Sequence, residues 1–299
     1  MADRAEQYEL VRTAVAGAVV ARDVISVRGP EAVTYLHGQL SQQVEGLAVG
    51  ATASTLLLQP AGKLDARLRM TRLADDEVVL DIEGGFGEAV VARLERFKLR
   101  TKCDIERLDD WTTVSLRGPG AAAVAADNAG DARIVADASW PGAPGVDLLG
   151  PGVGLPAGVT GCDTDVLELV RVEAGWPAMG SELTEKTIPA EAGIVDAAVD
   201  FTKGCYVGQE LVARIDSRGG NVPRHLRGVR VTGGVPEAGA ELSVDGASVG
   251  SLTTVAVRPD GVAVALAYVK RAIEPPADAI VEGPDGPLAA EIALLPLVG

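Results

Sequence analysis

The segment of this 299-residue chain that is richest in chemistry reads Lys203-Gly204-Cys205-Tyr206-Val207-Gly208-Gln209-Glu210. Two glycines four residues apart let the backbone approach a ligand closely, and a lysine two residues from Cys205 favours its thiolate. Gln209 and Glu210 begin a predicted helix that runs toward Arg214. The segment therefore predicts a cysteine displayed at the start of a helix. The alternative is a turn with a buried, inert thiol, because free cysteines are among the most buried residues.

A second candidate is a carboxylate on an apolar helix face. In the helix predicted from Val166 to Ala174, Val166, Leu169 and Val170 fall at i, i+3 and i+4, and the next position of that face, i+7, is Glu173. Buried charge is costly unless it is hydrogen-bonded, so Glu173 is a ligand candidate. In the alternative reading the helix has frayed, and Glu173 meets solvent or Arg171.

The formal charge of −15 repels phosphate backbones and argues against duplex DNA or bulk RNA as a main partner. One stretch departs from this balance, since the chain between Arg214 and Arg230 holds five arginines and His225 against a single acid, Asp216. Such a run is either an anion site or a solvated basic rim.

The cysteines and the first residues indicate a cytoplasmic protein. Cys103, Cys162 and Cys205 are odd in number and widely spaced, which suits reduced thiols. The start has no apolar leader, and no later stretch is long and apolar enough to span a membrane. With only His37 and His225 besides these thiols, we expect no metal site.

A short pattern recurs along the chain and predicts its organisation. Ser-apolar-Arg-Gly-Pro occurs at Ser26–Pro30 and again 89 residues later at Ser115–Pro119, each time before a helical stretch. This predicts two β–α units built on one plan. The strands and helix expected between the copies indicate an inserted α+β unit, and Pro141 to Gly158 is expected to be loop. The Gly84-Gly85-Phe86-Gly87 turn only partly mimics a dinucleotide fingerprint and is read as an ordinary strand-to-helix turn.

After Gly219 the sequence pattern changes to short predicted β-strands separated by turns such as Val244-Asp245-Gly246-Ala247. This pattern predicts a small closed β-barrel. The fold class is therefore α+β. We expect a discontinuous α+β domain over residues 1–48 and 112–218, an inserted α+β domain over 49–111 and a C-terminal barrel over 219–299.

Four segments together resemble the signature of the YgfZ proteins, which are bacterial relatives of the mitochondrial iron–sulfur assembly factor Iba57 within the folate-binding superfamily of the glycine cleavage T-protein. These segments are Arg171–Pro177, Gly180–Leu183, Thr187–Glu191 and Lys203–Glu210. The repeated Arg-Gly-Pro units are also similar to that superfamily. The resemblance covers nearly the whole chain.

The resemblance implies a ring of three domains, two of them ferredoxin-like and one a barrel, with tetrahydrofolate or a one-carbon derivative in the central opening. It implies that Glu173 binds the pterin, whose N3–H and 2-amino group suit a carboxylate. By position it also implies that Cys205 is the functional thiol, and that the other motif residues and Arg214 help to bind the cofactor. Those residues are Lys203, Gly204, Tyr206, Gly208, Gln209 and Glu210.

The same resemblance implies an accessory role in assembling or repairing iron–sulfur enzymes, including radical enzymes that modify transfer RNA, with iron–sulfur proteins as partners and without direct RNA contact. An aminomethyltransferase of the superfamily would carry an Asn-Ala-x-Asn loop and then an aspartate after the strand near Ile82. The chain has Glu83–Val90 there and neither feature. One-carbon transfer by a folate-dependent aminomethyltransferase or N-demethylase is therefore the alternative, with Glu83 or Glu88 as a substitute base. The basic stretch ending at Arg230 is then a site for the folate glutamate tail or for RNA.

Overall fold

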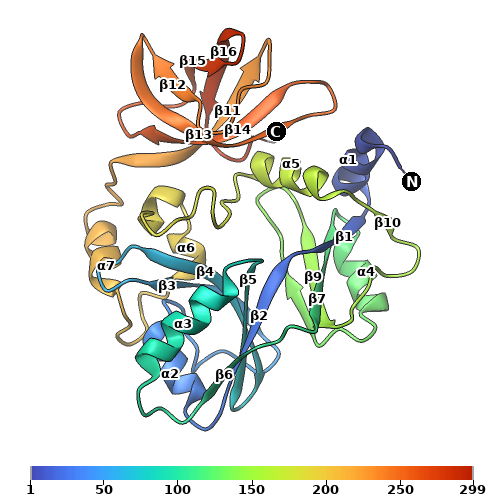
Figure 1. Ribbon diagram of the computed structural model, residues 1–299, viewed down its shortest axis with the longest axis vertical. Helices are drawn as coiled ribbons and strands as arrows, with labels where there is room; N and C mark the ends of the chain where they lie inside the picture. Colours follow the sequence, from blue (N-terminus) through green and yellow to red (C-terminus); the bar gives the residue numbers. More distant parts are fainter. Residues whose placement is uncertain (1, 298–299) are drawn as a thin grey trace.

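The computed structural model describes residues 2–297 and consists of two α+β units and a β-barrel (Figure 1). The barrel lies at one end of the molecule, and the two sheets lie side by side at the other. The predicted α+β class with a C-terminal barrel is confirmed. Within the described residues, no helix is long and apolar enough to cross a membrane.

The first sheet has the strand order β10-β1-β7-β9-β8. All its neighbours are antiparallel except β1 and β10. Helix α4 packs against β7 and β9, while α5 lies between this sheet and the barrel and contacts α1. The bounds of these elements are α1 Arg4–Thr13, β1 Ala16–Val20, β7 Trp111–Arg117, α4 Ala121–Asn128, β8 Ile134–Asp137, β9 Gly145–Pro151, β10 Thr160–Gly161 and α5 Thr164–Ala174.

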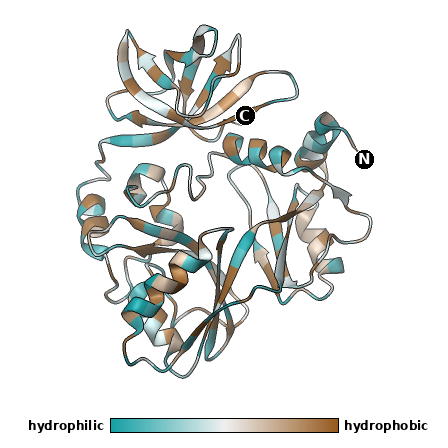
Figure 2. Ribbon diagram, in the orientation of Figure 1, coloured by the Kyte–Doolittle hydropathy of each residue, from teal (hydrophilic) through white to brown (hydrophobic). Residues whose placement is uncertain are grey.

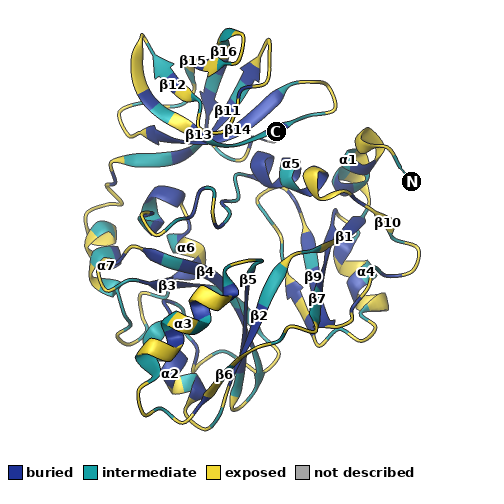
Figure 3. Cartoon of the chain, in the orientation of Figure 1, coloured by how far each residue is buried: buried dark blue, intermediate teal, exposed yellow. Residues whose placement is uncertain are grey.

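The second sheet is fully antiparallel, with the order β3-β4-β5-β2-β6. Helices α2 and α3 cover one of its faces, so that β4 and β5 are largely dark blue in Figure 3 while the outer side of α3 is yellow. Figure 2 shows the matching teal and brown stripes on α3. The bounds are β2 Arg22–Arg28, α2 Ala32–Gln39, β3 Thr52–Leu58, β4 Leu64–Ala74, β5 Glu77–Glu83, α3 Gly87–Lys98 and β6 Asp104–Arg107.

The repeated Arg-Gly-Pro pattern marks equivalent turns in the two sheets. Gly29 follows β2 with φ +140°, and Gly118 follows β7 with φ +119°. A Cβ at Gly29 would lie 2.7 Å from a backbone oxygen, and one at Gly118 would lie 2.5 Å from another. Only glycine fits both the backbone angle and the close contact, so each strand can turn directly into its helix.

The barrel closes in the order β11-β14-β13-β12-β15-β16, with β16 pairing back onto β11. Closure removes the free sheet edges. Its strands are β11 Arg224–Thr232, β12 Glu241–Val244, β13 Ala247–Val257, β14 Ala263–Lys270, β15 Ala277–Gly283 and β16 Gly286–Ala293. The segment that connects α5 to the barrel carries the 3-10 helix η1 Pro189–Ala192, α6 Val195–Ala198 and α7 Gln209–Ser217.

Two features differ from the sequence-based expectations. The stretch from Pro141 to Gly158 was expected to be loop but contains β9, whose glycine and proline content hid a buried strand. The expected division at residue 48 also differs from the division between the sheets, because β1 and β2 enter different sheets on either side of Ala21. The domain boundaries themselves stay a prediction.

A buried chain of ion pairs joins the two sheets. Arg69 of β4 lies opposite Asp81 of β5 and donates to both of its oxygens at 2.9 and 3.0 Å. The same guanidinium reaches Asp147 of β9 at 2.9 Å. Asp147 also accepts from Ser115 and pairs with Arg117, both on β7. Each charge therefore has a partner, as burial requires.

We expect Asp147→Asn to lower the free energy of unfolding by about 3 kcal/mol near neutral pH, because Arg69 and Arg117 lose a buried anion. Burial raises the pKa of Asp147, but these two guanidinium groups outweigh it and hold the pKa below its ordinary value. The stabilisation is thus complete above the unfolded-state pKa of about 4, and it is lost as the pH falls toward the folded-state pKa.

Denaturant unfolding curves recorded over this pH range measure the effect. Asp137→Asn is the matched control, because Asp137 is an exposed carboxylate of the same sheet and should change stability by less than about 0.5 kcal/mol. Equal losses in both variants, or a loss that persists unchanged in acid, would contradict the assigned role of Asp147.

Candidate functional site

A central cavity of about 710 Å³ lies between the two sheets and is lined by residues of both and of α5. Its charged lining is balanced, unlike the chain as a whole. Four carboxylates face it (Glu83, Asp137, Asp147, Glu168), together with five arginines (Arg22, Arg67, Arg69, Arg117, Arg171). Trp140 and Trp176 also line it. A flat, polar ligand with both donors and acceptors suits such a lining.

Strand alternation places these charges. Along β4, Ala66, Leu68 and Met70 are buried in the core under the helices, so Arg67 and Arg69 face the opposite side. On the neighbouring strand, Leu80 and Ile82 face the core, and Asp81 and Glu83 face the arginines. One sheet face therefore carries a two-by-two set of alternating charges.

The pair Arg67–Glu83 is held less completely than its neighbours. Arg67 Nη2 donates to Glu83 Oε1 at 2.8 Å, and the guanidinium lies 4.6 Å from the centroid of the Trp176 ring. Arg67 Nη1 and Glu83 Oε2 are buried, and neither has a hydrogen-bond partner among the described residues. Buried polar atoms are rarely left so, and a ligand with one acceptor and one donor would satisfy both.

A second chamber of about 310 Å³ continues the cavity toward the barrel, and the two share Arg67 and Trp176. His225 and Arg227 of β11 line it. Burial lowers the pKa of Arg227, and no carboxylate pairs with it in the described part of the chain. Within the basic stretch seen in the sequence, Arg227 is thus the arginine that faces this opening.

The other arginines of that stretch are placed differently. Arg224 pairs with Glu191 at 3.0 Å, and Arg230 pairs with Glu291 at 2.9 Å. Arg214 is exposed on α7. Arg218 is exposed as well. The stretch is therefore divided among exposed positions, ion pairs and the cavity, and it does not form one continuous basic surface.

Glu173 is fully buried, as its helical position predicts, but it points away from the central cavity. Its oxygens accept from Tyr8 at 3.0 and 3.1 Å, from Arg12 at 2.5 Å and from Arg258 at 2.5 Å. Tyr8 and Arg12 belong to α1, and Arg258 follows strand β13 of the barrel. The carboxylate thus joins three parts of the fold. Its predicted pterin contact stays a prediction, and the geometry favours Glu83 for that task.

We expect Glu173→Gln to lower the free energy of unfolding by about 3 kcal/mol, because two arginines lose their shared anion. Denaturant unfolding measures this. Glu9→Gln is the control, since it removes the same charge from an exposed position beside Arg12 and should cost less than about 0.5 kcal/mol. A Glu173→Gln protein of unchanged stability that no longer binds a folate would instead support the ligand role.

Cys205 is exposed, whereas Cys103 and Cys162 are buried. Burial raises the pKa of the Cys162 thiol to about 12 and also raises that of Cys103. Of the three thiols, Cys205 is the one that a partner in solution can reach. Neither chamber of the central cavity is lined by Cys205, so the structure separates the thiol from that cavity.

The residues around the thiol hold its loop in place. Lys203 Nζ donates to the carbonyl oxygens of His37, Leu40 and Gln42 at the C-terminal end of α2, at 2.6, 2.5 and 3.2 Å. A cation is favoured at that end of a helix, although burial lowers the pKa of Lys203 to about 8. The ammonium is thus used to anchor the loop to α2.

The two glycines of the motif differ. Gly208 has φ +84°, and a Cβ on it would lie 2.5 Å from the Gln59 carbonyl oxygen, whereas a Cβ on Gly204 would meet only the His37 ring at 3.7 Å. Tyr206 is half-buried against the core, and its backbone N–H donates to the Gln209 side chain at 3.0 Å. Glu210 is exposed. None of these residues lines either chamber, so their predicted cofactor contacts stay predictions.

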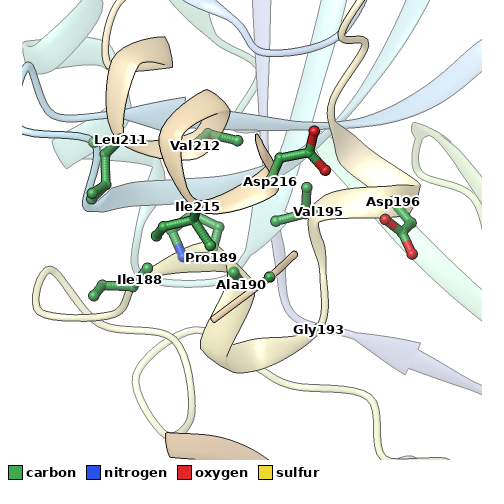
Figure 4. Close-up of a pocket in the computed structure, with 12 residues that line it drawn as sticks. Ile188, Pro189, Ala190, Gly193, Val195, Asp196, Leu211, Val212, Ile215 and Asp216 are labelled. Carbon is green, nitrogen blue, oxygen red and sulfur yellow. The ribbon is translucent and has the colours of Figure 1, made fainter. Parts of the chain in front are cut away.

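A smaller pocket of about 180 Å³ lies beneath α7 (Figure 4). Leu211, Val212 and Ile215 face the 3-10 helix η1 across it, and the carboxylates of Asp196 and Asp216 lie to one side. Its mostly apolar walls offer little to orient a polar ring. Among residues 2–297, no three His, Cys, Asp or Glu side chains gather as a metal site would require, and the expectation of no metal stays a prediction.

The sequence-based reasoning missed Arg67, Arg69 and Asp147. The signal was present in the alternation of charged and apolar residues from Leu64 to Met70, which marks a strand with one polar face. The partner of that face could not be found in the same way, because nothing local shows that Asp147 on another sheet lies against it.

With this geometry in place, the chain can be compared with known proteins. Residues 4–139 match the family described as the GCVT N-terminal domain. A crystal structure of the glycine cleavage system aminomethyltransferase T from Bartonella henselae superposes with a TM-score of 0.82 at 24% identity, covering 98% of this chain and 89% of that one. The chain therefore has the fold of that aminomethyltransferase, and its N-terminal part is similar to the GCVT N-terminal domain family.

Proteins of different kinds are similar to this chain at nearly equal identity. An uncharacterised protein of Haemophilus influenzae is 29% identical over 66% of this chain and 67% of its own length. An aminomethyltransferase of Streptomyces avermitilis is 29% identical over 85% and 78%. A mitochondrial iron–sulfur cluster assembly factor IBA57 homolog of Neurospora crassa is 28% identical over 67% of this chain and 50% of its own length. Identity alone does not choose between these functions.

Proposed function

We propose that the chain binds a tetrahydrofolate in the central cavity and serves as an accessory protein in iron–sulfur cluster assembly or repair, indirectly supporting radical enzymes that modify transfer RNA. The observation that carries the folate half is the Arg67–Glu83 pair beside Trp176, with its two buried and unpartnered atoms. The iron–sulfur half rests on the resemblance of the Lys203–Glu210 segment and on the IBA57 homolog among the relatives. A cytoplasmic location and iron–sulfur partners belong to the same proposal.

The cavity residues fit the chemical groups of a folate. Its fused ring is flat and carries adjacent donors and acceptors, which suit Trp176 and the Arg67–Glu83 pair. Its glutamate tail is anionic, and Arg227 offers positive charge in the second chamber. Burial and the nearby Arg227 and Arg271 lower the pKa of His225, which therefore lines the chamber as a neutral hydrogen-bonding group near neutral pH. The ring would bind in the larger chamber and the tail in the smaller one. Cys205, exposed on the motif loop, remains available to a protein partner.

Folate-dependent aminomethyl transfer or N-demethylation is the second candidate, favoured by the aminomethyltransferase relative that aligns over 85% of this chain. Such a reaction needs a positioned base. Of the two substitute bases, Glu83 and Glu88, Glu83 is the one that lines the cavity, and Arg67 and Arg22 outweigh its burial and lower its pKa. A carboxylate with a lowered pKa is a weak base, which favours the accessory role.

We expect the purified chain to bind 5-formyltetrahydrofolate, as measured by calorimetry, and Trp176→Leu to weaken that binding about tenfold because the ring loses its aromatic neighbour. Trp111→Leu is the matched control, since Trp111 lies outside both chambers and should leave the affinity unchanged. Failure of the unaltered chain to bind would reject the folate half of the proposal.

The thiol is tested separately in a strain that lacks this chain. Cys205→Ser should fail to restore iron–sulfur enzyme activity while keeping 5-formyltetrahydrofolate affinity, because Cys205 lies outside the cavity. Cys103→Ala removes a buried thiol and should restore activity. Full restoration by Cys205→Ser would remove the thiol from the mechanism. Turnover of an N-methyl or aminomethyl donor to 5,10-methylenetetrahydrofolate would support the second candidate instead.

A further inference from the structure

We propose that Arg67 and Glu83 recognise the lactam edge of a pteridine, where O4 and N3–H lie side by side. The central cavity would then select 4-oxo pteridines over 4-amino pteridines. The inference rests on the proposed folate site and adds its specificity. It starts from the incomplete contact between these two side chains.

Arginine and a carboxylate usually pair through two parallel hydrogen bonds, which use two nitrogens and two oxygens. Here the pair uses one of each, at 2.8 Å. The stacking of the guanidinium on Trp176 at 4.6 Å accounts for this, because it fixes the plane of Arg67 against the ring. The guanidinium keeps Nη1 free as a donor, and the carboxylate keeps Oε2 free as an acceptor.

The neighbouring charges show that this incompleteness is local. Arg69 donates from three nitrogens to Asp81 and Asp147, and neither carboxylate has an unpartnered buried oxygen. Among the described residues four buried side-chain atoms lack a partner, and two of them belong to the Arg67–Glu83 pair. A third, Arg117 Nε, belongs to another residue of the same cavity. The unsatisfied polar atoms therefore concentrate where a ligand would bind.

The charge states of Arg67 and Glu83 determine which hydrogen-bonding groups a ligand must present to them. Arg67 is only a donor, and the lowered pKa of Glu83 keeps its carboxylate ionised and only an acceptor near neutral pH. The ligand must therefore present an acceptor to Arg67 and a donor to Glu83. In a 4-oxo pteridine, O4 accepts and N3–H donates. In a 4-amino pteridine the same two positions carry a donor and an unprotonated nitrogen, so both contacts are lost and two buried groups stay unsatisfied.

Folic acid and aminopterin make a matched probe pair, because they differ at position 4 and share the tail. We expect folic acid to displace 5-formyltetrahydrofolate from the full-length chain at a concentration at least about tenfold lower than aminopterin requires. Glu83→Gln should bring this ratio close to one, because an amide can turn either its oxygen or its nitrogen toward the ligand. Glu106→Gln removes an equal charge from an exposed position on the same sheet, outside both chambers, and should leave the ratio unchanged.

The outcomes separate the two proposals. Equal competition by folic acid and aminopterin in the unaltered chain, with 5-formyltetrahydrofolate bound, would overturn the proposed recognition of the lactam edge and leave the folate site in place. An unchanged ratio of the aminopterin and folic acid concentrations in Glu83→Gln would also overturn this recognition, because the unpartnered atoms would then play no part in selecting the ligand. No binding of 5-formyltetrahydrofolate would overturn both. The comparison in the unaltered chain needs no variant, so loss of folding in Glu83→Gln cannot decide the result.

Discussion

The ion pair between Arg69 and Asp147 is the buried polar contact that joins the two sheets, beside an apolar cluster in which Val24 and Val79 of one sheet pack with Ile134, Ala136 and Leu149 of the other. Each sheet has one face covered by helices and a second face that carries charge, and charge cannot be buried without partners. Because Arg69 reaches both Asp81 of its own sheet and Asp147 of the other, the two polar faces satisfy each other. Paired charges do not pack as tightly as an apolar core, and the space left between them is the central cavity.

The barrel is held by the same principle. Glu173, Glu182 and Glu191 follow one another at intervals of nine residues, and all are buried. Each accepts from a barrel side chain: Glu173 from Arg258, Glu182 from Thr253 and Thr254, and Glu191 from Arg224. All three acids lie in the segments that resemble the family signature. Part of that signature therefore consists of residues that attach the barrel. For this reason, the burial of a glutamate there does not by itself indicate a ligand contact.

The sequence predicted what local pattern determines. The Arg-Gly-Pro turns, the barrel and the burial of Glu173 all follow from glycine conformation, turn spacing or helical period, and the structure confirms them. What Glu173 contacts did not follow, because its partners Arg12 and Arg258 lie 161 and 85 residues away along the chain. Strand β9 was missed for a different reason, since Gly145 serves close packing against Arg117 where a turn was expected.

The thiol loop and the cavity are separate, yet one pair of strands supports both. Gly208 packs against Leu58 and Gln59 at the end of β3, and Gly62 in the following turn packs against Leu211 of α7. The next strand, β4, pairs with β3 and carries Arg67 and Arg69 into the cavity. Since a paired strand transmits position more rigidly than a loop, the backbone that positions Arg67 also fixes the support of Cys205. A bound folate would therefore stabilise the same two strands on which the exposed thiol loop rests, without touching the thiol itself.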